Sequence, residues 1–340
     1  METNAEKSNY IAQCENRVFG KKDRLYLMGF AMLWIALFHI SYWLEDSKVN
    51  AAPFWIKMFA EGQLGVDIFF FLSAYGLEAS IERNSVMRFY CNRAKRLFPL
   101  YFLFLFILFF TVARDTSVER AFLQGFFQIT GISLIKYAHF FSTGFCFDWF
   151  TPAIIAIYIF FPVISRVVRY AERKGLMAEI FLLAFVVAAG HWIHMNKHFP
   201  LALLAYRLPI IVLGVMTYRH LHNGYLQRVL SLYILGAAFA FLCHEKAIIL
   251  SLMIPSLLTV FSMTRFELPF RNAVSLIGRY SYEVYLGHIF LVAFFIPSGY
   301  VTSVWLLSVI TIIGTLAISS FFAVFQESFY RVLNFYHRKK

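Results

Sequence analysis

Long apolar runs alternate with short polar segments along most of the 340-residue chain. Each run is roughly 17–22 residues long, the length of helix that crosses a hydrocarbon core about 30 Å thick. The pattern predicts an all-α fold, a polytopic transmembrane helical bundle of about ten spans. We expect these spans at 25–44, 61–82, 98–113, 149–168, 177–195, 201–218, 227–243, 247–263, 276–297 and 302–323.

The same pattern divides the chain into three predicted domains. Residues 1–24 are polar, lack a signal-peptide pattern and are expected to form a cytoplasmic N-terminal segment. Residues 25–323 form the predicted transmembrane domain, and residues 324–340 a basic cytoplasmic tail. Residues 114–148 mix polar residues with Phe-rich patches. For these we keep three interpretations: a long outer loop, an interfacial helix or a partly re-entrant segment.

Composition and charge agree with a membrane protein. Hydrophobic residues make up 60% of the chain and charged residues 15%, whereas soluble domains carry about 25% charged residues. The net charge of +12 does not call for nucleic acid as a partner. The predicted inner segments hold roughly three times as many Lys and Arg as the outer ones, which places both termini in the cytoplasm. We expect membrane lipid around the protein.

The four cysteines show no metal-ligand spacing, and no metal site is predicted. Cys14 and Cys91 are expected on the reducing side. Cys146 and Cys243 are expected toward the outer side, where a disulfide is possible. We interpret all four as structural residues.

Ionisable residues inside predicted spans are candidates for function, because a charge at the bilayer centre costs at least about 2.5 kcal/mol. Five of these residues matter most: His39, Asp67, Arg207, Glu283 and His288. Each also has a structural interpretation. A histidine can be packed and hydrogen-bonded, an aspartate can be held by a helix dipole, and an arginine can extend to the interface.

His39 and Asp67 form the predicted catalytic pair. His39 ends the apolar run of the first span, and imidazole is suited to general acid–base chemistry. Asp67 lies near the outer end of the second span. These two spans are antiparallel across a short loop, so the two side chains are expected at similar depth. A carboxylate beside an imidazole sets its tautomer and raises its basicity.

The other buried candidates are expected to stabilise charge on the substrate side. Arg207 is suited to holding an anion or a developing oxyanion. Pro209 is expected to kink the same helix and free a backbone carbonyl. Glu283 and His288 share the ninth span, with His288 near mid-membrane.

A pair of arginines, Arg93 and Arg96, lies on the predicted inner loop between the second and third spans. A fork of arginines one turn apart matches the geometry of a phosphate. The alternative is the ordinary excess of basic residues on the cytoplasmic side.

Several segments together resemble acyltransferase family 3, a family of integral membrane acyltransferases. GFAMLWIALFH, which ends at His39, is similar to the family's first span with its essential histidine. GQLGVDIFFFLSAYGLE is similar to its second span, and FYCNRAKRLFPLY to its inner-loop Arg-x-x-Arg signature. WFTPAIIAIYIFFP, RLPIIVLG and YSYEVYLGH resemble weaker later signatures.

Two departures from the family pattern bear on activity. Eleven positions before the histidine the family usually has Arg or Lys, and this chain has Met28. Arg24, one helical turn earlier on a similar face, is the candidate replacement. Many members carry Glu in the fourth span, where this chain has Ile154 and Ile155.

The resemblance implies an O-acyltransferase of surface glycans in a bacterial inner or plasma membrane. The implied donor is acetyl-CoA at the cytoplasmic side. The implied acceptor is a hydroxyl of a capsule, exopolysaccharide or lipopolysaccharide unit, or of its lipid-linked precursor. Under this hypothesis Arg93, Arg96 and Arg24 hold CoA, and His39 takes a proton or briefly carries the acyl group. His39 lies about 22 Å along the helix from Arg24, so the donor must reach deep into the bundle.

Two other function classes stay open. In a transporter or glycan translocator, Arg207 and His288 would line a substrate path. In an inactive relative that scaffolds glycan enzymes, Met28 would mark the lost activity. Donor chemistry separates these classes, since a transporter does not consume acetyl-CoA.

Overall fold

The computed structural model describes residues 19–46, 59–115, 117–135, 148–196, 201–242, 246–264, 270–295 and 304–338. The described residues form helices and connecting turns without a strand, which confirms the all-α class. The helices are α2 (Lys21–Asp46), α4 (Leu64–Arg83), α5 (Val86–Asp115), α6 (Val118–Thr130), α7 (Phe150–Lys174), α8 (Leu176–Asn196), α9 (Leu201–Ala205), α10 (Leu208–His222), α11 (Leu226–Leu242), α12 (Lys246–Thr264), α13 (Arg271–Arg279), α14 (Ser281–Phe295) and α15 (Val304–Arg338), with short 3-10 turns at Ala60–Gln63 and Ile132–Leu134.

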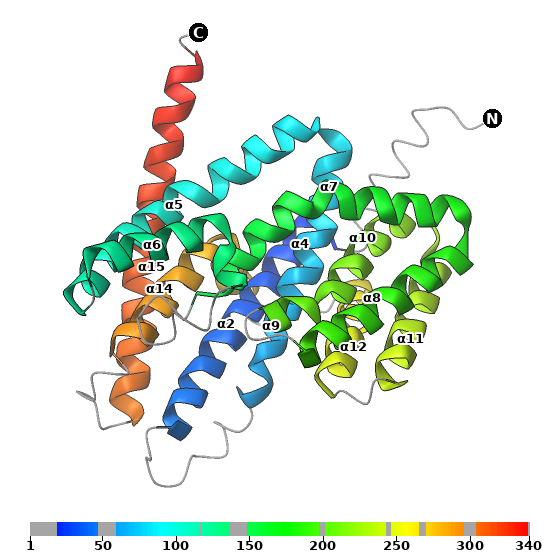
Figure 1. Cartoon of the computed structure of the whole chain (residues 1–340), viewed down its shortest axis with the longest axis horizontal. Helices are drawn as coiled ribbons and strands as arrows, with labels where there is room; N and C mark the ends of the chain where they lie inside the picture. The colour runs from blue at the N-terminus through cyan, green and yellow to red at the C-terminus, as the bar shows by residue number, and fades with distance from the viewer. Residues whose placement is uncertain are drawn as a thin grey trace. The chain divides into compact units, whose positions relative to one another are not determined.

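Every predicted span falls on one or two of these helices (Figure 1). Among the described residues, five helices are both long and apolar enough to cross a membrane: Glu61–Arg83, Phe150–Lys174, Leu176–Asn196, Leu201–His222 and Ile312–Val332. Leu226–Leu242 and Ile248–Met263 are apolar but shorter. The chain is thus a helical membrane protein, and the count of about ten spans and the side of the termini stay predictions.

The prediction that Arg93 and Arg96 lie on an inner loop is wrong. Both residues lie within α5, which begins at Val86 and continues through Pro99. The turn between α4 and α5 is only Asn84 and Ser85. The loop was expected because the segment is basic, but its residues are mostly good helix formers, and polarity alone does not end a helix. Two arginines three residues apart on one helix share a face, as the phosphate hypothesis requires.

Three other boundaries differ from the prediction. The sixth span is broken at Tyr206 and Arg207, between α9 and α10, where Pro209 occupies the first turn of α10. The ninth is divided at Tyr280 into α13 and α14. The last helix continues to Arg338, so most of the predicted tail is helical. Within 114–148 the described part contains α6, an amphipathic helix with exposed Phe122 and Phe126.

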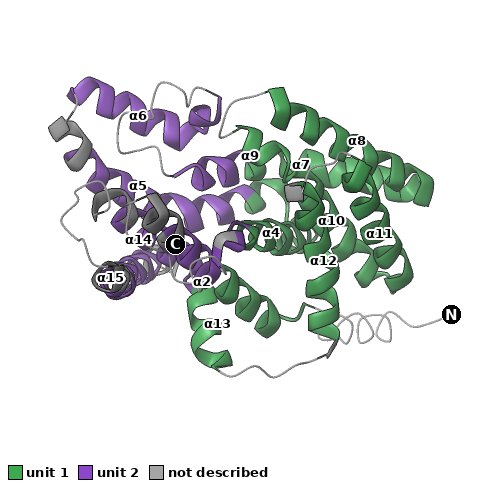
Figure 2. Cartoon of the chain, turned by 90° about the horizontal axis from the view of Figure 1, so that it is seen from below, with its two compact units in different colours: residues 1–31, 64–89, 157–279 green, residues 32–63, 90–156, 280–340 purple. Residues whose placement is uncertain are grey.

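The chain divides into two compact units, coloured separately in Figure 2. Unit 1 comprises residues 1–31, 64–89 and 157–279, and unit 2 comprises residues 32–63, 90–156 and 280–340. In unit 1, α10 is the most enclosed apolar helix and packs against α4. In unit 2, α14 and α15 lie side by side.

Small residues allow the closest helix contacts in unit 1. A Cβ on Gly29 of α2 would lie 1.8 Å from the Val274 carbonyl oxygen, and a Cβ on Gly278 of α13 would lie 1.8 Å from the Leu25 carbonyl oxygen. The two backbones therefore touch, and neither position has room for a side chain.

The substitution Gly278→Ala is expected to lower the free energy of unfolding by at least about 2 kcal/mol, because a methyl group must push two helix backbones apart. The measurement is the thermal midpoint of the purified protein in detergent. Gly125→Ala in α6 is the matched control, since nothing lies within 4 Å of a Cβ there. Equal midpoints for the two variants would contradict the contact.

Candidate active site

Two of the five ionisable candidates, His39 and His288, are paired within unit 2. Nε2 of His288 lies 3.2 Å from Nδ1 of His39, and the ring centroids are 5.2 Å apart. His288 is buried in α14 and His39 is partly buried in α2. The two residues are 249 positions apart in sequence. The structure therefore brings together two residues that the sequence proposed separately.

A backbone carbonyl fixes which nitrogen of each ring carries the proton. Nδ1 of His288 lies 3.2 Å from the Val284 carbonyl oxygen, which can only accept a hydrogen bond. With both rings neutral, Nδ1 of His288 is the donor and its Nε2 is an acceptor. Nδ1 of His39 then donates to that Nε2. This leaves the lone pair of His39 on Nε2, the arrangement that a general base requires.

The ring of His288 also contacts a tyrosine that leads to a buried carboxyl group. Tyr285 meets His288 edge to face at 5.4 Å between centroids. The Tyr285 hydroxyl donates to Oδ1 of Asp148 over 2.8 Å. Asp148, directly before α7, also accepts from the Thr151 backbone N–H at 3.0 Å. Burial raises the pKa of the Asp148 carboxyl, and the hydrogen bonds from Thr151 and Tyr285 act in the opposite direction.

The second predicted catalytic residue, Asp67, is paired with Arg207 in unit 1. Oδ1 of Asp67 lies 2.9 Å from Nε of Arg207, and both side chains are almost fully buried. Arg207 stands at the N-terminal end of α10, donates to the Leu203 carbonyl at 3.0 Å and lies over the Tyr206 ring. An adjacent carboxylate satisfies the buried guanidinium in place of water. His39 and Asp67 belong to different units, and their predicted pairing stays a prediction.

The predicted donor-binding arginines are also divided between the units. In unit 2, Arg96 is exposed on α5 and interacts electrostatically with Glu283 of α14. Its backbone carbonyl accepts from Gln326 of α15 at 3.1 Å. Arg93 is partly buried one turn before it. In unit 1, the Arg24 guanidinium lies 5.8 Å from the centre of the Tyr75 ring.

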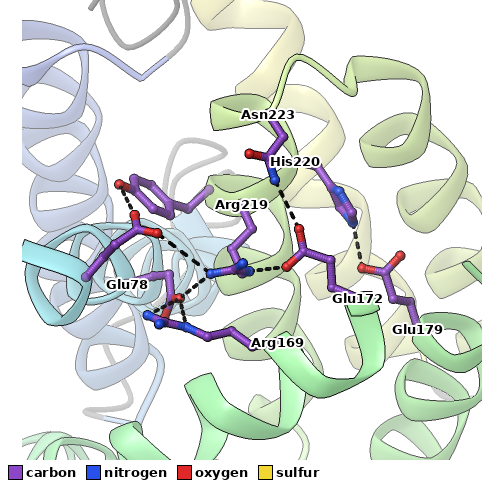
Figure 3. A network of polar contacts seen from close by, with 9 residues as sticks. Glu78, Arg169, Glu172, Glu179, Arg219, His220 and Asn223 are labelled. Atoms are coloured by element: carbon purple, nitrogen blue, oxygen red, sulfur yellow. Dashed lines mark hydrogen bonds and ion pairs between the residues drawn. The ribbon is translucent and has the colours of Figure 1, made fainter. Parts of the chain in front are cut away.

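Sequence reasoning missed a charged network in unit 1 (Figure 3). Glu78 of α4, fully buried, accepts from Arg169 of α7 at 3.1 Å and from Arg219 of α10 at 3.2 Å. Arg219 also binds Glu172. In the sequence, Arg169 and Arg219 look like part of the general cytoplasmic excess of basic residues. The signal for a network is the presence of acidic residues at the same helix ends, here Glu78 and Glu172, because each arginine then has a partner of opposite charge.

A second buried pair extends the same region. Nε2 of His220 in α10 lies 2.6 Å from Oε1 of Glu179 in α8, and both side chains are buried. Together with the Glu78 network, this pair joins α4, α7, α8 and α10 at one end. The arrangement is that of a structural clamp, since each of these side chains has a protein partner on another helix.

The cysteine predictions concern mostly residues outside the described ranges. Cys91 is described, and it is a free cysteine, exposed on α5. Cys14, Cys146 and Cys243 lie outside the described residues. Among the residues that are described, no group of three His, Cys, Asp or Glu side chains could hold a metal ion.

Apolar helices that enclose a histidine pair and ion pairs define a helical membrane protein with buried polar groups. Comparison with known protein families then supplies its functional class. The acyltransferase domain of acyltransferase family 3 matches residues 26–324. The chain therefore belongs to this family of membrane acyltransferases, and the resemblance seen in the motifs is confirmed.

Similarity to curated proteins points the same way. The chain is 30% identical over 164 residues to "Putative acetyltransferase ORF330" of Acidianus two-tailed virus. The match covers 46% of this chain and 44% of that protein, so less than half of the relative is spanned. No solved structure matches the chain.

Proposed function

We propose that this protein is a membrane O-acyltransferase that transfers an acetyl group from acetyl-CoA to a hydroxyl of a surface polysaccharide or its lipid-linked precursor. The observation that carries the proposal is the His39–His288 pair, which leaves the Nε2 lone pair of His39 available as a base. Family membership supplies the reaction type. The location proposed is a bacterial plasma membrane, with both termini in the cytoplasm.

Proton transfer at His39 is the proposed chemical step. Nε2 of His39 takes the proton of the acceptor hydroxyl while the hydroxyl oxygen attacks the thioester carbonyl carbon. The C–S bond then breaks, the ester forms, and the CoA thiolate leaves with the proton that His39 has held. A brief acyl-imidazole on His39 is the alternative route to the same products. In both routes His288 holds His39 in one tautomer.

The remaining predicted residues are assigned to binding. Arg93 and Arg96, with Arg24, are proposed to hold the CoA phosphates. Asp67 and Arg207 are proposed to act together on the acceptor side, since their ion pair makes an isolated anion clamp less suitable. Glu283 is proposed to set the charge around Arg96, with which it interacts.

Changing Arg93 and Arg96 together to Gln is expected to raise the KM for acetyl-CoA about 10-fold or more and to flatten its dependence on salt, because two phosphate-binding charges are lost. The measurement is the initial rate of acetyl transfer at several salt concentrations. Arg88→Gln is the control, an exposed arginine on the same helix. If Arg88→Gln has the same effect as the double variant, the loss reflects general surface charge and the assigned site is wrong.

The acceptor is identified by mass analysis of surface glycans from the host with and without the gene. In the host without the gene, we expect one sugar unit to be lighter by about 42 mass units for each missing acetyl group. This is the mass difference between an acetyl group and the hydrogen that replaces it, and it is the same for any sugar. A transporter would instead change the amount or the location of a glycan without consuming acetyl-CoA. Unaltered acetylation together with an unaltered rate of acetyl-CoA consumption would contradict the proposal.

A further inference from the structure

Asp148 is a buried carboxyl group that the proposed mechanism does not use. Its side chain is 3% exposed, in the irregular segment directly before α7 in unit 2. Oδ1 accepts two hydrogen bonds, one from the Thr151 backbone N–H and one from the Tyr285 hydroxyl, and the carboxyl group also interacts with the Tyr101 hydroxyl. The first is an ordinary N-cap bond, which any of Ser, Thr, Asn or Asp can make. The second reaches a residue 137 positions away and has no role in capping.

The second bond places Asp148 at the end of a chain of contacts that leads to the histidine pair. Tyr285 is held at its hydroxyl by Asp148 and at its ring by Phe150, whose centroid is 5.1 Å away. The same ring stacks on Tyr282, with centroids 6.4 Å apart, and packs edge to face on His288. His288 in turn accepts from His39. All of these residues lie within unit 2.

We infer that Asp148 is a positioning residue for acyl transfer, which fixes the Tyr285 ring and through it the His288 imidazole that orients His39. The inference rests on the proposed function. His288 meets the Val284 carbonyl through Nδ1 and the Tyr285 ring edge to face. A Tyr285 ring that is free to turn would let the imidazole rotate about its Cβ–Cγ bond. The hydrogen bond from His39 requires a defined ring plane, so that rotation would weaken it.

A double-mutant cycle of Tyr285→Phe and Asp148→Ser tests the inference. Tyr285→Phe keeps the ring against His288 and the N-cap bond of Asp148, and removes only the bond between them. Asp148→Ser keeps a cap for α7 but is too short to hold the Tyr285 hydroxyl. Each single variant is expected to lower kcat about 10-fold or more with the KM for acetyl-CoA unchanged, and the double variant is expected to be no slower than Asp148→Ser alone.

The control for helix capping is Ser117→Ala, which removes the N-cap of α6 in the same unit. It is expected to lower the thermal midpoint and leave kcat unchanged. The test requires a preparation in which the wild type transfers acetyl groups and the His39→Ala variant does not. In that preparation, an unchanged kcat of Tyr285→Phe would overturn the inference and leave the proposed function standing. Absence of acetyl transfer by the wild type itself would overturn the proposed function. Tyr285→Phe keeps the test decisive if Asp148→Ser fails to fold.

Discussion

Replacing His39 with alanine is expected to reduce the O-acetyl content of the host's surface glycan about 100- to 10,000-fold. This is the range that one general acid–base residue contributes to an enzymatic rate. The physical reason is the loss of the Nε2 lone pair that the His288 hydrogen bond leaves on His39. The measurement is the O-acetyl content of purified glycan from a gene-deleted host that carries either the wild type or the variant at matched protein level.

The matched control for this prediction is His191→Ala. His191 is a partly buried histidine on α8, in unit 1, which separates the loss of a specific base from the loss of any histidine. Its O-acetyl content is expected to equal that of the wild type. Acetylation by the His39→Ala variant at the wild-type level would end the catalytic assignment. Blotting of the membrane fraction shows whether the His39→Ala variant is present at the wild-type level. Only preparations with matched protein levels are compared.

The activities of His288 variants are expected to depend on whether the new side chain places a polar atom at the position of Nε2. His288→Ala should lower kcat about 10- to 100-fold, because His39 loses the acceptor that fixes its tautomer. His288→Gln should keep more activity, since its amide oxygen can occupy the position of Nε2 and accept from Nδ1 of His39. His288→Asn should keep less than His288→Gln, because its amide lies nearer to the position of Nδ1. The measurement is kcat of acetyl transfer by purified protein in liposomes.

The order of these variants carries the test. A role in packing alone predicts that His288→Asn and His288→Gln behave alike, since both are polar amides that fill much of the imidazole volume. A role as a second base predicts that neither amide retains activity. Higher activity in His288→Gln than in His288→Asn and His288→Ala follows if a hydrogen bond at the Nε2 position of His288 orients His39. The reverse order would contradict a role for that bond.

The predicted spans could be located from the sequence because each is marked by an apolar run. What failed was the assignment of polar stretches. The basic segment around Arg93 is helical because its residues favour a helix and nothing before Pro99 interrupts it. The break at Arg207 could be anticipated from Pro209, whose ring is tolerated in the first turn and not further inside.

The candidate site could be predicted residue by residue, but its pairing could not. His39, His288, Asp67 and Arg207 were each identifiable because ionisable groups are rare inside apolar runs. Similar depth in neighbouring spans favoured a pair between His39 and Asp67. The structure pairs His39 with His288 and Asp67 with Arg207. Partners so distant in sequence are selected by tertiary packing, which no local pattern records.

Glu78 and Asp148 were missed for a related reason. Glu78 lies at the end of a predicted span, where a carboxylate is expected in water, and its burial results from Arg169 and Arg219 on two other helices. Asp148 lies in a segment without periodicity, and its contact with Tyr285 joins α7 to α14. An acid at a span end, matched by basic residues at the same predicted level, is the pattern that would have indicated the first of these.

The most direct test of the account is transfer of labelled acetyl groups from acetyl-CoA by the purified protein in liposomes. The acceptor is the glycan fraction extracted from a gene-deleted host. The account predicts alkali-labile label in the glycan and one equivalent of released CoA for each acetyl group with the wild type, and neither product above background with His39→Ala. Equal transfer by both proteins would contradict the claim that the histidine pair performs the chemistry.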